Sequence, residues 1–242
     1  MLITRSWIES QSSRIPRDTG RFLGTLIRMI ETPGAGFAPN AQMVEQAPGW
    51  VLATHFHREY QFQLFVSGSG TLGRHEVRPL MLHYTSPESG YGPITAGPQG
   101  LAYYTLRSSA PAGACYLPEA RETMQQGLAK RHAMSQRIAV GAQLPGVAQA
   151  ADVETCIALD DGGMGAWKVS IAPGGTFAVS QLPGAGARYY YVASGDVGAD
   201  ARMLEAGSIL FAHAQPGLIL RAGDAGAEVI AMQFPIAASA AV

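Results

Sequence analysis

The sequence predicts an all-β protein that contains two similar β-barrels. Short apolar runs alternate with turns formed by the 29 glycines and 15 prolines scattered along the 242 residues. Runs of this length between Gly and Pro turns are typical of antiparallel strands in a sandwich or barrel. The clearest candidate strands of the first half are residues 22–30, 50–57, 61–66, 80–85 and 101–106.

The second half of the chain repeats landmarks of the first. The segment LFVSGSGTLG around Gly68 resembles YYVASGDVGAD around Gly195, and AGPQGLAYYTLR from Ala96 resembles AGDAGAEVIAMQFP from Ala222. The two alignments give offsets of about 127 and about 126 residues, and a nearly constant offset indicates an internal duplication. We therefore expect two β-domains in tandem.

The segment between the two halves has the charge pattern of a helix. It opens with a proline and acidic residues and closes with basic ones: Pro118, Glu119, Glu122, Lys130, Arg131 and His132. Acids in the first turn and bases in the last turn favour a helix. We expect an N-terminal domain at 1–115 that bears the site, a helical connector at 116–145 and a C-terminal domain at 146–242 with a degenerate site.

The composition excludes several classes of partner. With 14% charged residues and a formal net charge of −1, the chain lacks the basic footprint of proteins that bind nucleic acid or anionic membranes. Charged residues usually make up about 25% of a domain, so the shortage favours burial of apolar surface between subunits, and we expect a homodimer. No apolar stretch is long enough to cross a bilayer and no export signal is visible, so we expect a cytoplasmic protein.

Four of the six histidines, namely His55, His57, His75 and His83, lie in one short part of the first half. His55 and His57 are two residues apart on a predicted strand, so both imidazoles should point to the same face. Residues 58–60 are expected to form a hairpin turn that brings Gln61 beside them, with Glu59 facing solvent. For His75, among charged neighbours, an exposed strand edge is expected.

Two imidazoles and an oxygen donor that converge in an apolar pocket form a typical divalent-metal site. Gln61, Gln63 and Phe65 share one face of the next predicted strand, and this face could line a barrel interior. The alternative is that His55 and His57 are ordinary strand residues whose ring nitrogens are hydrogen-bonded. Gln61 would then form hydrogen bonds in the pocket without coordinating a metal. The flanking glycines favour the metal site.

The same segment resembles the first motif of the cupin superfamily. That motif is Gly, five residues, His-x-His, three or four residues, Glu, six residues, Gly. Here Gly49, His55, His57, Gln61 and Gly68 match every spacing, with Gln61 in place of the Glu. The resemblance implies a bicupin, with two tandem barrels of the double-stranded β-helix or jelly-roll type. It also implies a divalent Fe, Mn, Ni or Zn ion, which a neutral amide would bind more weakly than a carboxylate.

The second cupin motif, which normally supplies a last histidine ligand, is displaced. Gly73 and Pro79 match its start, but the histidine is then expected at position 84, and His83 misses it by one residue. On a strand, a shift of one residue places the side chain on the opposite face. His83 and Tyr91 both remain candidates for the last ligand.

We expect a small-molecule substrate to contact Gln63, Tyr91 and Glu88, but the sequence identifies no catalytic residue. In the second half, the positions that match the motif fall near Leu182, Gly184 and Arg188, which are not metal ligands. The resemblance implies a metal-dependent enzyme of the dioxygenase type, acting on a small oxygen-rich or aromatic substrate. The alternative is a non-catalytic module that binds a small ligand or sugar without metal chemistry.

Overall fold

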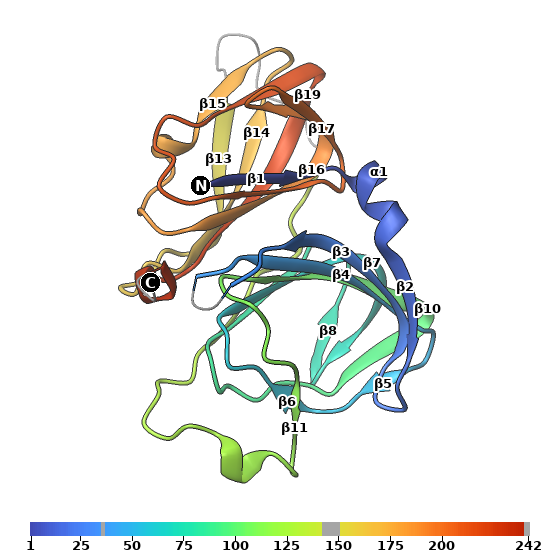
Figure 1. The fold of residues 1–242 in the computed structure, drawn as a ribbon. Coiled ribbons are helices and arrows are strands. Elements are labelled where there is room, and N and C mark those ends of the chain that lie inside the picture. Colours follow the sequence, from blue (N-terminus) through green and yellow to red (C-terminus); the bar gives the residue numbers. More distant parts are fainter. Residues whose placement is uncertain (35–36, 142–150, 240–242) are drawn as a thin grey trace. The chain divides into compact units, whose positions relative to one another are not determined.

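The computed structural model describes residues 1–34, 37–141 and 151–239, and the chain divides into two compact units (Figure 1). One unit comprises Ser12–Arg137, and the other combines Met1–Gln11 with Ile138–Val242. Both consist mainly of antiparallel strands, which confirms the predicted all-β class. No helix in the described part of the chain is long and apolar enough to cross a membrane.

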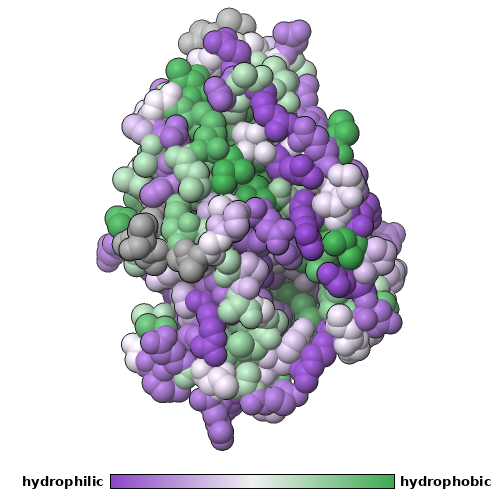
Figure 2. Space-filling view, viewed as in Figure 1, coloured by the Kyte–Doolittle hydropathy of each residue, from purple (hydrophilic) through white to green (hydrophobic). Residues whose placement is uncertain are grey.

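The Ser12–Arg137 unit contains a sheet in the order β12-β9-β7-β10-β4-β3-β2, to which β5 and β8 add at β10 and β7. A second, two-stranded sheet joins β6 to β11. On the face shown in Figure 2 this unit is hollowed, and apolar residues lie inside the hollow. The strands are β2 (Arg14–Asp18), β3 (Leu23–Glu31), β4 (Asn40–Gln46), β5 (Val51–Leu52), β6 (His55–Phe56), β7 (Gln61–Leu72), β8 (His75–Val77), β9 (Leu82–Thr85), β10 (Ile94–Arg107), β11 (Cys115–Tyr116) and β12 (His132–Met134).

The second unit has a sheet in the order β1-β18-β16-β19-β14-β13, to which β15 and β17 add at β19 and β16. Short helices α1 (Trp7–Ser10) and α2 (Ile236–Ser239) and the 3-10 turns η1 (Gln11–Ser13) and η3 (Val179–Gln181) complete the description of this part of the chain. The strands are β1 (Leu2–Arg5), β13 (Ala151–Ile157), β14 (Gly165–Ile171), β15 (Thr176–Ala178), β16 (Arg188–Ala199), β17 (Arg202–Glu205), β18 (Ile209–Ala212) and β19 (Ile219–Gln233).

The internal repeat of the sequence corresponds to matching strand orders. The series β9-β7-β10-β4-β3 of one sheet has the same succession as β18-β16-β19-β14-β13 of the other. Gly68 in β7 and Gly195 in β16 both have left-handed backbone, with φ of 72° and 67°. A Cβ at either glycine would collide with a carbonyl oxygen of the neighbouring strand, that of Gly100 or Gly226. The repeated glycines therefore mark a close approach of two strands.

The core of the Ser12–Arg137 unit results from alternation along its long central strands. Phe65 on β7 and Tyr103 on β10 are buried, with ring centroids 5.5 Å apart. The same inward face continues to Gln61 and Gln63 at one end of β7 and to Thr105 and Arg107 at the end of β10. The barrel interior is therefore apolar along much of its length and polar at one end.

The structure differs from the expected domain boundaries. Residues 1–11 belong with the C-terminal unit, because β1 pairs along its whole length with β18. Residues 116–137 belong with the N-terminal unit, because β12 pairs with β9. The expected boundary between connector and C-terminal domain, at 145–146, lies outside the described residues.

The helix expected within the connector, at 116–145, is not formed in the described residues 118–137. This segment contains a single 3-10 turn, η2 (Arg121–Thr123), and then the strand β12. Gly127 has left-handed backbone, with φ of 80°, which interrupts a helix. Beyond it, Arg131 N donates to Ser86 Oγ and Ser86 N donates to Arg131 O, so the backbone is committed to other partners. Tertiary pairing has overridden the local charge pattern.

Candidate metal and ligand site

A cavity of about 390 Å³ opens into the polar end of the Ser12–Arg137 barrel. Its volume is within the usual range of small-molecule sites, about 300–1,000 Å³. Aromatic and aliphatic side chains form part of its wall, including Phe22, Leu26 and Tyr103. Its polar lining includes His55, His57, Gln63, Tyr91, Thr105 and Arg107.

Both ring nitrogens of His55 take part in hydrogen bonds that fix the orientation of the ring. Its Nδ1 lies 2.7 Å from Ala53 O and its Nε2 lies 3.0 Å from the hydroxyl oxygen of Tyr91. A carbonyl oxygen only accepts, so Nδ1 carries the hydrogen and Nε2 presents its lone pair to Tyr91. The backbone of His55 pairs with Tyr91 and with Tyr116 of β11. The expected hairpin of the histidine strand with β7 is therefore replaced by pairing with these two segments.

His57 presents a second lone pair to the cavity. Its Nδ1 lies 3.0 Å from Gly113 O and must donate to it, which leaves Nε2 as the unprotonated nitrogen. The ring centroids of His55 and His57 are 5.3 Å apart, and both rings line the same cavity. The prediction that the two imidazoles share a face is confirmed. A donor bond from one ring nitrogen to a backbone carbonyl is the usual arrangement for a metal-binding histidine.

Burial keeps both imidazoles neutral at physiological pH. Desolvation, with a smaller contribution from the positive charge of Arg107, lowers the pKa of His55 to about 4. Desolvation and the same arginine lower the pKa of His57 to about 2. A neutral imidazole is the form that binds a metal ion.

Gln61 and Tyr91 meet beside His55. The Nε2 group of Gln61 donates to the Tyr91 hydroxyl oxygen at 2.8 Å, and the same hydroxyl can donate to His55 Nε2. Gln61 is fully buried, and its Oε1 has no hydrogen-bond partner among the described residues. An unsatisfied buried carbonyl oxygen costs about 1–3 kcal/mol unless a ligand occupies it.

His83 lies on the inward face of its strand, contrary to the spacing argument. It pairs with Gln63 across β9 and β7, and its Nδ1 lies 2.8 Å from Gln63 Oε1. The turn before β9 explains the difference. The motif spacing expects its glycine at position 81, whereas the left-handed residue of this turn is Leu80, with φ of 64°. The turn thus ends one residue early and moves His83 to the inner face.

His83 is nevertheless separated from the other two histidines. Its Nε2 lies 3.3 Å from Nδ1 of His132, and these two rings line a different cavity of about 520 Å³. Tyr91 lines both cavities, with ring centroids 4.5 Å from His55 and 5.3 Å from His83. The Tyr91 side chain therefore divides the interior between the histidines of the two motifs.

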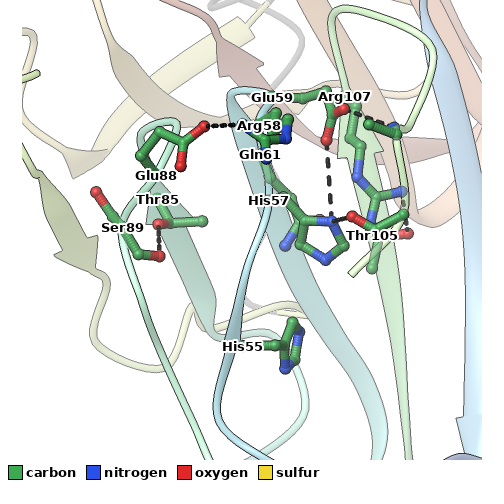
Figure 3. A network of polar contacts seen from close by, with 12 residues as sticks. His55, His57, Arg58, Glu59, Gln61, Thr85, Glu88, Ser89, Thr105 and Arg107 are labelled. Atoms are coloured by element: carbon green, nitrogen blue, oxygen red, sulfur yellow. Dashed lines mark hydrogen bonds and ion pairs between the residues drawn. The ribbon is translucent and has the colours of Figure 1, made fainter. Parts of the chain in front are cut away.

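The remaining predicted residues differ in position. Gln63 lines the cavity, whereas Glu88 is held elsewhere by Arg58 and by the backbone N of Gln125, at 3.0 and 3.2 Å. Figure 3 shows Glu88 beside Thr85 and Ser89, apart from His55 and His57, with a hydrogen bond from Arg58 to its carboxylate. The structure does not bring Glu88 into the cavity lining.

Sequence reasoning missed three polar residues near the site. Glu59, expected to face solvent, is 6% exposed; its Oε1 accepts from Ala112 N, and its Oε2 points toward His57, 3.9 Å from Nδ1 (Figure 3). His132 was assigned to the connector helix. Arg107 ends β10 directly opposite Gln61. Alternation from Tyr103 through Thr105 could have placed Arg107 on the inner face.

The donor set fits a divalent ion with few protein ligands. In the described part of the chain, no group of three or more His, Cys, Asp or Glu residues is arranged to hold a metal. A metal site would therefore combine Nε2 of His55 and His57 with Oε1 of Gln61, which has no hydrogen-bond partner among the described residues. The hydroxyl oxygen of Tyr91 lies 3.0 Å from Nε2 of His55. For His55 Nε2 to bind a metal, the Tyr91 hydroxyl would have to turn its hydrogen away from that nitrogen.

One of the C-terminal positions near the motif match, Arg188, is engaged by internal hydrogen bonds in the described part of that unit. Arg188, at the start of β16, is 6% exposed and donates to Gln233 Oε1 at 2.8 Å. It also donates to four backbone carbonyl oxygens, those of Val179, Leu182, Pro183 and Gly184. This guanidinium is satisfied within the unit and acts as a structural tie.

The strand orders of the two antiparallel sheets match the cupin fold. No protein-family model and no curated protein sequence matches the chain. Solved structures match it throughout. The bacterial pirin YhhW of Escherichia coli, solved with nickel(II), is 15% identical, with a TM-score of 0.58 over 97% of this chain and 99% of that one.

Two further cupin-fold structures align over most of their length. A "putative dioxygenase" from Nostoc punctiforme is 13% identical, with a TM-score of 0.63 over 98% of this chain and 80% of that one. The oxalate decarboxylase OxdC of Bacillus subtilis is 12% identical, with a TM-score of 0.58 over 96% and 76%. At these identities the likeness establishes the fold, and the site must be argued from its own residues.

Proposed function

We propose that this chain is a divalent-metal-binding bicupin with its metal site in the Ser12–Arg137 barrel. One observation carries the proposal. His55 and His57 each use Nδ1 to donate to a backbone carbonyl, so both direct an unprotonated Nε2 into one buried cavity. The orphaned Oε1 of Gln61 supplies an oxygen donor beside them. Two imidazoles and one oxygen leave open coordination positions.

The chain's own residues would prepare this site for chemistry. Desolvation raises the pKa of Tyr91 to about 12, so its hydroxyl stays protonated and is available as a hydrogen-bond donor. Arg107 adds a positive charge to the cavity, and the apolar wall excludes water from a bound substrate. A divalent ion with open positions would supply Lewis-acid or redox chemistry toward a substrate or dioxygen.

The proposed activity is that of a metal-dependent enzyme of the dioxygenase type, acting on a small oxygen-rich or aromatic molecule. The nickel(II) of the pirin structure, the Mn(II) centres of oxalate decarboxylase and the dioxygenase description of the Nostoc protein support a metal in this fold. The matching strand orders support descent of both barrels from one duplicated unit.

Metal analysis of the refilled protein tests the proposal. The chain is stripped with chelator, refilled separately with Fe(II), Mn(II), Ni(II) and Zn(II), desalted and measured by elemental analysis. We expect about one ion per chain for at least one metal, because the proposed site holds a single ion. His57→Ala should lose that ion and His75→Ala, an exposed histidine of the same unit, should retain it. Equal metal content in the two variants would contradict the proposal.

A non-catalytic binding module is the second candidate, favoured by Gln61, which adds no negative charge to the metal. Dioxygen uptake separates the two. The metal-loaded chain is measured in an oxygen electrode with small phenols, diketones and carboxylic acids. Uptake that requires both the metal and His57 supports the enzyme. Ligand binding without any metal-dependent uptake supports the module.

A further inference from the structure

Three side chains form a row of hydrogen bonds between the two cavities of the N-terminal barrel. We call the cavity lined by His55 and His57 the histidine cavity, and the one lined by His83 and His132 the outer cavity. Gln63 lines the histidine cavity. Its Oε1 lies 2.8 Å from Nδ1 of His83, and Nε2 of His83 lies 3.3 Å from Nδ1 of His132. The neighbouring strands β7, β9 and β12 contribute one side chain each to this row.

The inner part of the row is buried, whereas its outer end reaches solvent. Gln63 is 1% exposed and His83 is 2% exposed, but His132 is an exposed residue. The ring of His132 stacks on that of His83, with an interplanar angle of 12° and centroids 5.5 Å apart. Buried polar groups keep their hydrogen bonds, because an unpaired one has lost its water without replacement. The stacked ring and the amide therefore hold His83 in one orientation.

The amide of Gln63 sets the direction of these hydrogen bonds. Its carbonyl Oε1 only accepts, so Nδ1 of His83 carries the hydrogen and donates to it. A neutral imidazole has a single N–H, so Nε2 of His83 accepts and Nδ1 of His132 donates to it. Because Oε1 is engaged by His83, the Nε2 amide group is the end of Gln63 that can donate to a ligand in the histidine cavity.

This donor lies next to the acceptors of the proposed metal site. Gln61 is two residues before Gln63 on β7, so the two side chains share a face of the strand. Oε1 of Gln61 and Nε2 of His55 and His57 are the atoms that a metal would occupy. An amide N–H at the next position of the same face is placed to bind an oxygen atom of a molecule that enters beside them.

We propose that Gln63 selects ligands by donating a hydrogen bond to a carbonyl oxygen, and that His83 and His132 are positioning residues that fix its amide. A ligand without an acceptor at that point would leave a buried N–H unpaired, which is how polar sites reject apolar analogues. The inference rests on the proposed function, because it concerns a small molecule in the same cavity. It deepens that function by naming the ligand class, a small carbonyl compound.

Acetophenone and ethylbenzene are matched probes, because they are similar in size and differ in one carbonyl oxygen. Each is titrated into the chelator-treated full chain, and the two dissociation constants are measured by ligand-observed NMR. Their ratio is the carbonyl preference. We expect this preference to fall about 5-fold in Gln63→Met, which is the value of one neutral hydrogen bond. Comparing ratios between chains removes the difference in hydration between the two probes.

Variants of the outer pair test the positioning role. His83→Leu should lower the carbonyl preference, because nothing then holds Oε1 of Gln63 away from the ligand. His83→Asn keeps an amide N–H close to the place of Nδ1 and should restore the preference. His75→Leu is the control, because His75 is an exposed histidine that lines the same outer cavity, and it should leave the preference unchanged. A lower preference in His83→Leu that His83→Asn does not restore would contradict the positioning role.

The nitrogen chemical shifts of the imidazole rings give a readout that needs no ligand. We expect His83 to carry its hydrogen on Nδ1 in the wild-type chain. Gln63→Glu should keep this tautomer, because a carboxylate oxygen accepts in the same place, but should lose the carbonyl preference, because it has no N–H to donate. A hydrogen on Nε2 of His83 in the wild-type chain would overturn the inference, since Gln63 would then donate to His83 and present its oxygen to the ligand.

A carbonyl preference that is the same in the wild-type chain and in Gln63→Met would also overturn the inference, and so would a wild-type chain that does not bind acetophenone. If Gln63→Met does not fold, Gln63→Glu and the wild-type ring nitrogens still decide. The experiment contains no metal. A chain that shows the preference but never binds metal refutes only the metal proposal, and a chain that binds metal but shows no preference refutes only this one.

Discussion

Arg107 lies directly opposite Gln61 across the central strands β10 and β7. The C-terminal unit carries the same two residue types in reversed order, with Arg188 on β16 opposite Gln233 on β19. In the C-terminal unit Arg188 Nε donates to Gln233 Oε1, whereas the Oε1 of Gln61 has no hydrogen-bond partner among the described residues. One barrel end is therefore closed by an internal tie, and the other is left available to ligands.

The tie in the C-terminal unit should be important for stability. Arg188→Met keeps much of the side-chain volume but leaves the carbonyls of Pro183 and Gly184 without this donor. We expect a loss of about 2–4 kcal/mol in the free energy of unfolding, because more than one buried acceptor loses its donor at about 1–3 kcal/mol each. Chemical denaturation measures it, with Arg221→Met, an exposed arginine, as control. A loss below about 1 kcal/mol would show that the guanidinium is not structural.

The close approach of β7 and β10 predicts unequal costs at two glycines. Gly49 and Gly68 both have left-handed φ, 69° and 72°. A Cβ on Gly49 meets nothing within 4 Å, whereas one on Gly68 collides with Gly100 O. Gly49→Ala should cost about 1–2 kcal/mol for the backbone conformation, and Gly68→Ala about 1–3 kcal/mol more for the collision. Equal losses in urea denaturation would contradict this strand geometry.

The neutral histidines predict loss of stability in acid. Desolvation lowers the pKa of His55 to about 4, of His57 to about 2 and of His83 to about 3, whereas unfolded histidine titrates near its ordinary value of 6.5. The folded chain therefore binds fewer protons, so stability is complete above pH 6.5 and falls as the pH decreases toward about 4.

Three such groups give a slope of about 2 kcal/mol per pH unit at pH 6.5, which rises to at most about 4 kcal/mol per pH unit roughly one unit lower, where unfolded histidine is fully protonated. Urea denaturation of the chelator-treated chain between pH 7.5 and 5 measures this slope. His57→Gln should reduce the slope, because it removes one of the three buried imidazoles. Stability that stays constant down to pH 5 would mean that the histidines are solvated or charged in the folded state.

Gln61→Glu should lower the stability of the metal-free chain and raise its affinity for metal. The new carboxylate would be fully buried at the position of Gln61 and would lose the amide donor to the Tyr91 hydroxyl. We expect the apo chain to lose about 1–3 kcal/mol of stability and the metal-loaded chain to gain affinity from the added negative charge. Thermal unfolding with and without Ni(II) measures both effects. If Ni(II) bound the variant more weakly than the wild type, Gln61 would lie outside the metal's ligand shell.

Much of the fold could be predicted from the sequence, because the apolar runs and the turn residues between them indicate the same strand boundaries. The candidate strands at 22–30, 61–66 and 101–106 lie within or overlap β3, β7 and β10, and the glycines near each strand allow the turns and close contacts that the fold needs. The repeat around Gly68 and Gly195 could be recognised because both positions require left-handed backbone. Such local requirements are visible in a single sequence.

Long-range pairing was not visible in the same way. The charges at 118–137 favour a helix, but β12 exists because its backbone pairs with β9. The first residues were assigned to the N-terminal domain, but β1 completes the other sheet. Spacing placed His83 on the outer face, because no rule indicated that Leu80 would adopt the left-handed turn.

The paired Nε2 atoms of His55 and His57 are the centre of this account, and calorimetric titration of the chelator-treated chain with Ni(II) tests them most directly. We predict a single site in the wild-type chain, abolished by His55→Ala/His57→Ala and retained by His83→Gln, because Tyr91 separates His83 from the pair. Ni(II) binding that survives in the double variant, or that is abolished by His83→Gln alone, would contradict it.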